Sequence, residues 1–149
     1  MFINFSNHPS KLWAEDERNA ALQYGTIEDL AFPQVPANMS TDGVRKLAEE
    51  YAEKILAKKP DCVMCQGEFC LSWHVIARLK EAGVRVAAAC SERIVEEVYG
   101  ENGTEKRSVF RFVQFREYSL LIGGPFSSSR TCVHYIFLVI FLSFLSIFS

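Results

Sequence analysis

Short apolar stretches of this chain are followed at once by side chains that can hold a small polar ligand. These side chains carry hydroxyl, amide, imidazole, carboxylate and guanidinium groups. Gly67 stands among them without a Cβ and precedes a predicted helix, whose free N–H groups and positive dipole end suit a phosphate or another anion. The candidate site residues are Ser6, Asn7 and His8 after the first stretch, Gln66, Gly67 and Glu68 after the third, and Ser91 and Arg93 after the fourth.

The elements that must position these residues alternate between strand-like and helix-like patterns. The second helix has apolar residues at helical spacing from Val44 to Ile55, with Ser40 or Thr41 as its cap and Pro60 after its end. Gly25 and Gly83 are the predicted stops of the first and third helices. Strands are predicted at 2–5, 26–32, 62–65 and 84–90, helices within 13–24, 41–59 and 69–82, and a closing hairpin at 94–99 and 108–115.

Strands that alternate with helices over short connections predict a mainly parallel sheet with helices on both faces. We therefore expect a Rossmann-like three-layer α/β domain with a C-terminal β-hairpin. Ligands of such sheets bind at the carboxyl ends of the strands, where the winding reverses. In a 2-1-3-4 strand order the first and third strand ends converge, and the candidate residues line one crevice. The alternative is that they are ordinary turn residues, with Ser10 as the cap of the first helix.

Length and composition limit the classes of function. The 149 residues suit one ordinary domain. A net charge of −2 and a pI of about 5.9 give no overall electrostatic case for binding duplex nucleic acid. Met1 leads directly into a strand-like stretch without a basic leader, so we expect a cytoplasmic protein whose five cysteines are reduced thiols.

Several familiar sites are excluded or made improbable by the pattern. Neither GxGxxG nor GxxxxGK[ST] occurs, so no dinucleotide fingerprint or P-loop is expected. Cys62 and Cys65 fall within a predicted strand, where residues three apart point to opposite faces, which argues against a redox pair. His74 and His134 lack the neighbouring ligands of a zinc site. We expect no metal and no cofactor.

The last part of the chain has a different composition. Between Ser119 and Ser149 the only charged residue is Arg130, and the run from Cys132 is apolar to the end. We therefore divide the chain into a domain, 1–118, and a hydrophobic tail, 119–149. The run 132–149 has about the minimum length of a membrane-spanning helix, so it is either a C-terminal anchor or an extension acquired by a frame disruption. Only a genuine anchor would make a membrane a partner.

Five segments together resemble a known group of proteins. They are INFSNHP at the first strand end, AFPQV after the second strand, MCQGEF before the third helix, AACSER after the fourth strand and the closing SVFRFVQFREY. The combination is similar to small CRISPR-associated proteins of the CARF-like and ring-nuclease type. The resemblance covers residues 1–118, and the hydrophobic tail departs from it.

The resemblance implies a cyclic oligoadenylate second messenger as ligand, bound across a homodimer in antiviral defence signalling. It also implies metal-independent cleavage, in which a ribose 2′-hydroxyl attacks the adjacent phosphate. Arg93 would then hold phosphate charge and His8 would transfer a proton, while the remaining candidates contact phosphate, ribose or adenine. Two alternatives stay open: a non-catalytic nucleotide-binding sensor or sponge, and a membrane-tethered interaction module.

Overall fold

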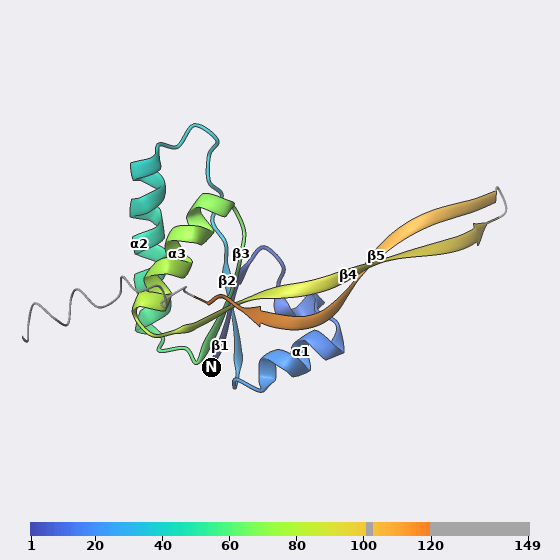
Figure 1. The fold of residues 1–149 in the computed structure, drawn as a ribbon, viewed down its shortest axis with the longest axis horizontal. Coiled ribbons are helices and arrows are strands. Elements are labelled where there is room, and N and C mark those ends of the chain that lie inside the picture. Colours follow the sequence, from blue (N-terminus) through green and yellow to red (C-terminus); the bar gives the residue numbers. More distant parts are fainter. Residues whose placement is uncertain (101–102, 120–149) are drawn as a thin grey trace, which may run out of the picture. The chain divides into compact units, whose positions relative to one another are not determined.

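The computed structural model of the chain describes residues 1–100 and 103–119 (Figure 1). Residues Met1–Tyr118 form one compact unit. Its strands are β1 (Phe2–Ser6), β2 (Ile27–Ala31), β3 (Cys62–Gln66), β4 (Arg85–Gly100) and β5 (Gly103–Glu117). Its helices are α1 (Glu15–Leu22), α2 (Thr41–Ala57) and α3 (Phe69–Glu81), and a 3₁₀ turn, η1 (Ser10–Leu12), precedes α1.

The strands form one five-stranded sheet in the order β2-β1-β3-β4-β5. The pairs β1–β2, β1–β3 and β3–β4 are parallel, while β4 and β5 are antiparallel. The chain moves from β1 to β2 at one edge and then returns past β1 to β3, so the winding reverses between β1 and β3. The prediction of an α/β fold with a mainly parallel sheet is confirmed at this level.

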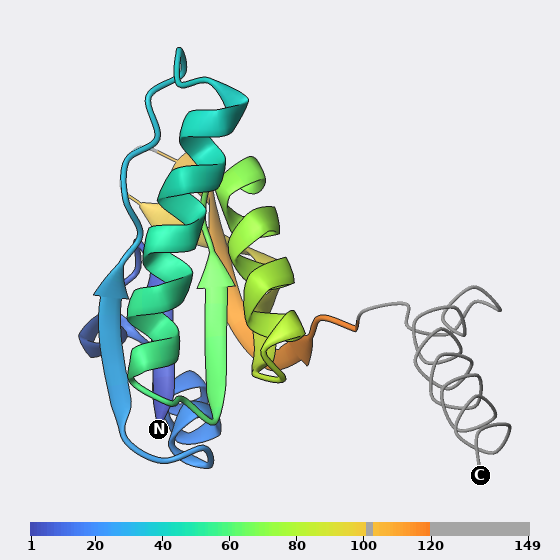
Figure 2. The same ribbon diagram turned by 90° about the vertical axis from the view of Figure 1, so that its left-hand side faces the viewer.

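Helices cover both faces of the sheet: α2 and α3 lie on one face and α1 on the other (Figure 1). Figure 2 looks onto the face covered by α2 and α3. Strand residues alternate between the two faces, so Ile3 and Phe5 join the core under α2 and α3, while Phe2 joins a smaller core with Trp13 and Ala21. The face beneath the short helix α1 therefore has less apolar cover.

The second and third helices follow their sequence patterns. The Oγ atom of Ser40 accepts a hydrogen bond from the Gly43 N–H (3.1 Å), as predicted for an N-cap. Gly83 follows α3 with a φ of 79°, a left-handed conformation that glycine adopts without strain. Val44, Ala48 and Ile55 are buried, which confirms the predicted apolar face of α2.

Two predicted boundaries are wrong. The helix expected within 13–24 starts only at Glu15, and Trp13 lies before it in extended conformation. The strand expected at 84–90 does not end there: β4 continues to Gly100 and pairs with β5 over almost its whole length, with a bulge between Cys90 and Ser91. The two strands leave the rest of the sheet as a long arm (Figure 1).

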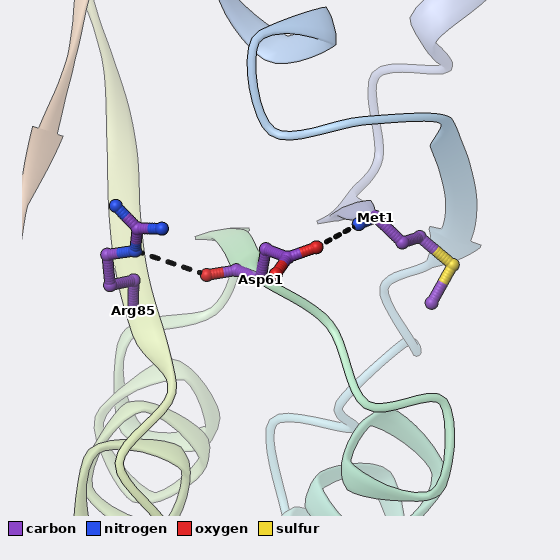
Figure 3. A network of polar contacts seen from close by, with 3 residues as sticks. All are labelled: Met1, Asp61 and Arg85. Atoms are coloured by element: carbon purple, nitrogen blue, oxygen red, sulfur yellow. Dashed lines mark hydrogen bonds and ion pairs between the residues drawn. The ribbon is translucent and has the colours of Figure 1, made fainter.

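The amino ends of the central strands are tied together by polar contacts (Figure 3). The N-terminal amine of Met1 forms an ion pair with the Asp61 carboxylate, and the Asp61 N–H donates to the Met1 carbonyl (2.9 Å). Arg85 donates to the Asp61 carbonyl (3.4 Å). The bond and the charge of the amine lower the pKa of Asp61. This network joins β1, β3 and β4 at their amino ends, and the candidate site lies at the opposite ends of the strands.

Most of the predicted tail, 119–149, lies outside the described residues. In the part of the chain that the structure describes, none of the helices is long and apolar enough to cross a membrane. The two sequence-based alternatives for 132–149, anchor or acquired extension, therefore both stay predictions.

Candidate functional site

A pocket of about 430 Å³ opens at the carboxyl ends of β1 and β3, on the face covered by α1. This is where the winding reverses, the position at which parallel α/β sheets bind ligands. Its floor is formed by strand residues and its walls by the loop after β1, helix α1 and the arm. The lining includes Ser6, His8, Trp13, Glu17, Gln66, Ser91, Phe110 and Phe112.

The structure brings four of the eight predicted site residues to this pocket: Ser6, His8, Gln66 and Ser91. Asn7 and Glu68 instead line a neighbouring pocket of about 490 Å³ beside the segment from Phe32 to Pro36. Gly67 and Arg93 line neither of these two pockets. The single crevice predicted from the sequence is therefore divided into two pockets.

A buried asparagine in the middle of β1 organises the loop that carries His8. Asn4 is 1 % exposed and points to the α1 face. Its amide nitrogen donates to the His8 carbonyl (2.8 Å) and to the Asp29 carboxylate (2.7 Å), and its oxygen accepts from the Ser6 hydroxyl (2.7 Å). The Ser6 Oγ in turn accepts from the His8 N–H (3.1 Å). Both Ser6 and Asn4 thus hold the backbone of His8 in place.

Asp29 on β2 also holds the loop that follows β1 in place. Its carboxylate accepts from the Ser10 N–H (3.0 and 3.1 Å) and from the Ser10 hydroxyl (3.0 Å). Ser10 is therefore not the cap of the first helix, as one alternative held. The indole N–H of Trp13 donates to the His8 carbonyl (3.2 Å), which brings its ring to the pocket wall.

Gln66 has a structural partner at the pocket floor. Its amide nitrogen donates to the Ala89 carbonyl and its oxygen accepts from the Ala89 N–H, both at 3.2 Å. Regular pairing between β3 and β4 ends at Met64 and Ala87, so the Gln66 side chain extends it where β4 turns away. The amide is held in place by this contact, which leaves it only its second N–H and second lone pair for a ligand.

The predicted strand exit at Ser91 and Arg93 does not exist, because both residues lie within β4. Ser91 pairs with Phe112 and Arg93 with Phe110, so all four lie on one face of the arm, which includes the pocket wall. The Arg93 guanidinium donates from Nε (3.0 Å) and Nη2 (2.8 Å) to the hydroxyl of Ser108. Arg93 is exposed on this face, directly opposite Phe110 on the neighbouring strand.

Gly67 is explained by packing rather than by the approach of a ligand. A Cβ atom at this position would lie 2.5 Å from three carbon atoms of the Phe32 ring. That ring is 5 % exposed and packs against Phe5, with 4.7 Å between the ring centroids. The absence of a side chain at Gly67 therefore makes room for Phe32.

Glu68 is the N-cap of α3. Its two carboxylate oxygens accept from the backbone N–H groups of Cys70 (3.0 Å) and Leu71 (2.7 Å), and these bonds hold the pKa of Glu68 below its ordinary value. The protein's own carboxylate therefore occupies two of the N–H groups that this helix start was predicted to offer to an anion.

Replacing Glu68 by alanine is expected to lower the free energy of unfolding by about 1 kcal/mol at pH 7. A folded-state pKa below the ordinary value of about 4.5 means that the stabilisation is complete above that pH and disappears as the pH falls through the folded-state pKa. Urea unfolding of Glu68→Ala and Glu68→Gln at pH 7 and at pH 3 measures this. Glu53→Ala, a change at an exposed position of α2, is the control. If Glu68→Ala lowered the free energy of unfolding equally at both pH values, the capping role of Glu68 would be contradicted.

Glu17 is the pocket residue that the sequence did not single out. It lies in the first turn of α1 and is half-buried. Burial raises its pKa, and the neighbouring Asp16 raises it further, while His8 acts in the opposite direction. Its carboxylate therefore takes up a proton more readily than an exposed glutamate does. The aromatic residues Trp13 and Phe110 were also missed as pocket walls.

The thiols of β3 are separated by the sheet, as predicted. Cys65 lies in the core under α2 and α3, and Cys62 in the core under α1. Burial raises the pKa of Cys65 to about 12 and that of Cys62 to about 11. Both are therefore protonated at neutral pH and poor nucleophiles. Among the residues that the structure describes, no group of three or more possible metal-ligating side chains comes together.

The fold and the pocket define an α/β protein with a candidate ligand site at the reversal point of a mixed five-stranded sheet. The sequence matches the model of the family described as Uncharacterized protein MJ1673 family over residues 1–116. The chain belongs to this family, and the match covers the whole sheet except the last residue of β5. No curated protein sequence matches the chain.

Proposed function

We propose that this chain is a Rossmann-like domain that binds a cyclic oligoadenylate in the pocket at the ends of β1 and β3. The observation that carries the proposal is the pocket itself, which lies at the strand-order reversal and combines aromatic walls with a few polar groups. The resemblance of residues 1–118 to CRISPR-associated ring-nuclease-type proteins supports this ligand and a role in antiviral signalling.

The chemistry of the pocket suits an adenine nucleotide. Trp13 and Phe110 offer aromatic faces on which single-stranded bases stack. Phe110 is 70 % exposed, so its ring is accessible to a ligand in the pocket. Arg93 lies beside it and brings a positive charge near the place where a phosphate would follow a stacked base.

A second copy of the chain is part of the proposal. Beyond Ala87 the strand β4 pairs with β5 alone, and a two-stranded ribbon is only marginally stable in water. Val95 and Phe110 lie exposed on the arm's pocket-side face. We infer that two chains pack through their arms and enclose one two-fold symmetric ring between two pockets.

Titration of the full chain with cyclic tri-, tetra- and hexa-adenylate, followed by calorimetry, tests the proposal. We expect one of these rings to bind with a stoichiometry of one per two chains. Phe110→Ala is expected to weaken its binding about tenfold or more, since a base stacked on an aromatic ring contributes about 1–3 kcal/mol.

Phe69→Ala is the matched control, because Phe69 is 90 % exposed on α3 and does not line this pocket. The same phenylalanine change there should leave ring binding as it is. If none of the rings bound at micromolar protein, or if both variants weakened binding equally, the proposal would be refuted.

A further inference from the structure

The opposite face of the sheet is also hollowed, along the seam where α2 and α3 lie side by side (Figure 2). A cavity of about 280 Å³ opens between the first turns of these helices and the segment before α2, and a cavity of about 200 Å³ lies one turn further along the seam. His74 on α3 lines both cavities. They therefore adjoin, and we call the two together the α2–α3 groove.

Helical spacing explains the course of the groove. From α3 it is lined by Cys70, His74 and Arg78, which are four residues apart and therefore share one face of the helix over about 12 Å. Ala48 on α2 and Ala77 on α3 line the second cavity. Their short side chains leave open a space that longer side chains would fill.

The first half of the groove, the larger cavity, is mainly apolar. Its polar lining, apart from His74, consists of Thr41, Glu68 and Cys70, and the Glu68 carboxylate is already bound to backbone N–H groups of α3. The apolar walls come from the segment before α2 and from its first turn: Val35, Pro36, Ala37, Met39 and Val44. A cavity of this composition suits an apolar group of a small ligand.

The second half carries charges of both signs. It is lined by two guanidinium and two carboxylate groups, those of Arg45, Arg78, Glu49 and Glu81. Arg45 donates to Asp42 through Nη1 (3.1 Å), which leaves its other N–H groups for a ligand. Arg78 approaches Glu81 only to 4.0 Å, a distance longer than a hydrogen bond. Both signs of charge are therefore available beside the apolar half.

We propose that the α2–α3 groove binds a free α-amino acid with an apolar side chain, such as leucine or methionine. The side chain enters the apolar half beside Met39. The α-carboxylate is bound by Arg78 and Arg45, and the α-ammonium group by Glu49. The inference is independent of the proposed function, because among the described residues this groove and the pocket at the ends of β1 and β3 share none of their lining.

The mixture of charges decides between ligand classes. A fatty acid would bring its carboxylate close to Glu49 and Glu81, and an alkyl amine would bring its ammonium group close to the two arginines. Each of these ligands would meet like charges that it cannot compensate. A nucleotide carries several negative charges and fits less well still. A zwitterion with an apolar side chain matches both halves of the groove.

Calorimetric titration of the full chain with L-leucine, L-methionine and L-phenylalanine tests the proposal. We expect at least one of them to bind with a stoichiometry of one per chain. Leucinamide lacks the carboxylate and N-acetyl-leucine lacks the ammonium group, so each should bind about tenfold more weakly than leucine or worse. These two analogues also imitate the two ends of a peptide, and they therefore distinguish a free amino acid from a peptide terminus.

Two substitutions assign the charges. Arg78→Gln should weaken leucine binding about threefold or more, less than the loss of the ligand's carboxylate because Arg45 remains. The preference for leucine over leucinamide should shrink in Arg78→Gln, and the preference for leucine over N-acetyl-leucine should shrink in Glu49→Gln. The matched controls are Arg116→Gln on β5 and Glu53→Gln on α2, both exposed and outside the groove, and they should leave both preferences unchanged.

The imidazole resonances in proton NMR locate the site. Leucine should shift the resonances of His74, assigned with a His74→Gln variant, and leave those of His8 in place, because His8 lines the pocket on the other face. Phe110→Ala should not alter leucine binding, so this inference and the proposed function can fail separately.

Four results would overturn the proposal. The first is that none of the three amino acids binds at millimolar concentration, and the second is that leucinamide or N-acetyl-leucine binds as tightly as leucine. The third is an equal effect of Arg78→Gln and Arg116→Gln on leucine binding, which would indicate net charge alone. The fourth is a shift of the His8 resonances instead of those of His74.

Discussion

Asn4→Ala is expected to destabilise the fold by about 3 kcal/mol and to release the loop that carries His8. The substitution removes a fully buried amide that makes hydrogen bonds to three partners, at 2.7, 2.7 and 2.8 Å. The buried hydroxyl of Ser6 then loses its acceptor at 2.7 Å and keeps only the His8 carbonyl at 3.4 Å, while that carbonyl loses the Asn4 donor. Urea unfolding at pH 7 measures the first effect.

Asn7→Ala is the matched control for this prediction. It changes the same residue type three positions later, where the side chain is exposed, and should alter the free energy of unfolding by less than about 0.5 kcal/mol. Asp29→Asn tests the other end of the network. Because Asp29 is exposed on the edge strand, this change should lower the free energy of unfolding less than Asn4→Ala does. Equal effects of the Asn4 and Asn7 changes would show that the network does not contribute to stability.

Much of the fold could be predicted because its signals are local. The apolar spacing of α2, its Ser40 cap and the Gly83 stop of α3 are each contained within a few neighbouring residues. The arm could not be predicted in the same way. A strand end was indicated by three polar residues, Ser91, Glu92 and Arg93. A two-stranded ribbon that leaves the core is exposed to solvent on both faces, so it can continue through polar residues.

The candidate site was predictable only in part, for a similar reason. The positions of Ser6, His8 and Gln66 follow from strand order, and they do meet at the pocket. The contribution of Glu17 depends on how α1 packs beside the loop and the arm, and an acidic residue in the segment EDER gives no sign of burial. Asn4 did leave a signal, a single amide inside an apolar run at an inward-facing position.

Phe2→Ala is expected to lower the free energy of unfolding by about 3–5 kcal/mol and to loosen the pocket as well. Phe2 is completely buried, and its ring lies 6.2 Å from that of Trp13, 5.8 Å from Tyr24 and 5.0 Å from Phe115, centroid to centroid. It therefore connects β1 to the segments before and after α1 and to β5. A cavity here removes the support beneath the walls that hold Glu17 and Trp13.

A comparison with Phe5→Ala distinguishes a general loss of stability from a change at the pocket wall. Phe5 is equally buried but belongs to the core under α2 and α3. Both variants should lose similar stability, while only Phe2→Ala should change the fluorescence of Trp13 well below the unfolding temperature. A Trp73→Phe background removes the second tryptophan, which is 68 % exposed. If Phe5→Ala changed the Trp13 signal as much as Phe2→Ala, the two cores would not be independent, and the α1 face could not be treated as a separate support of the site.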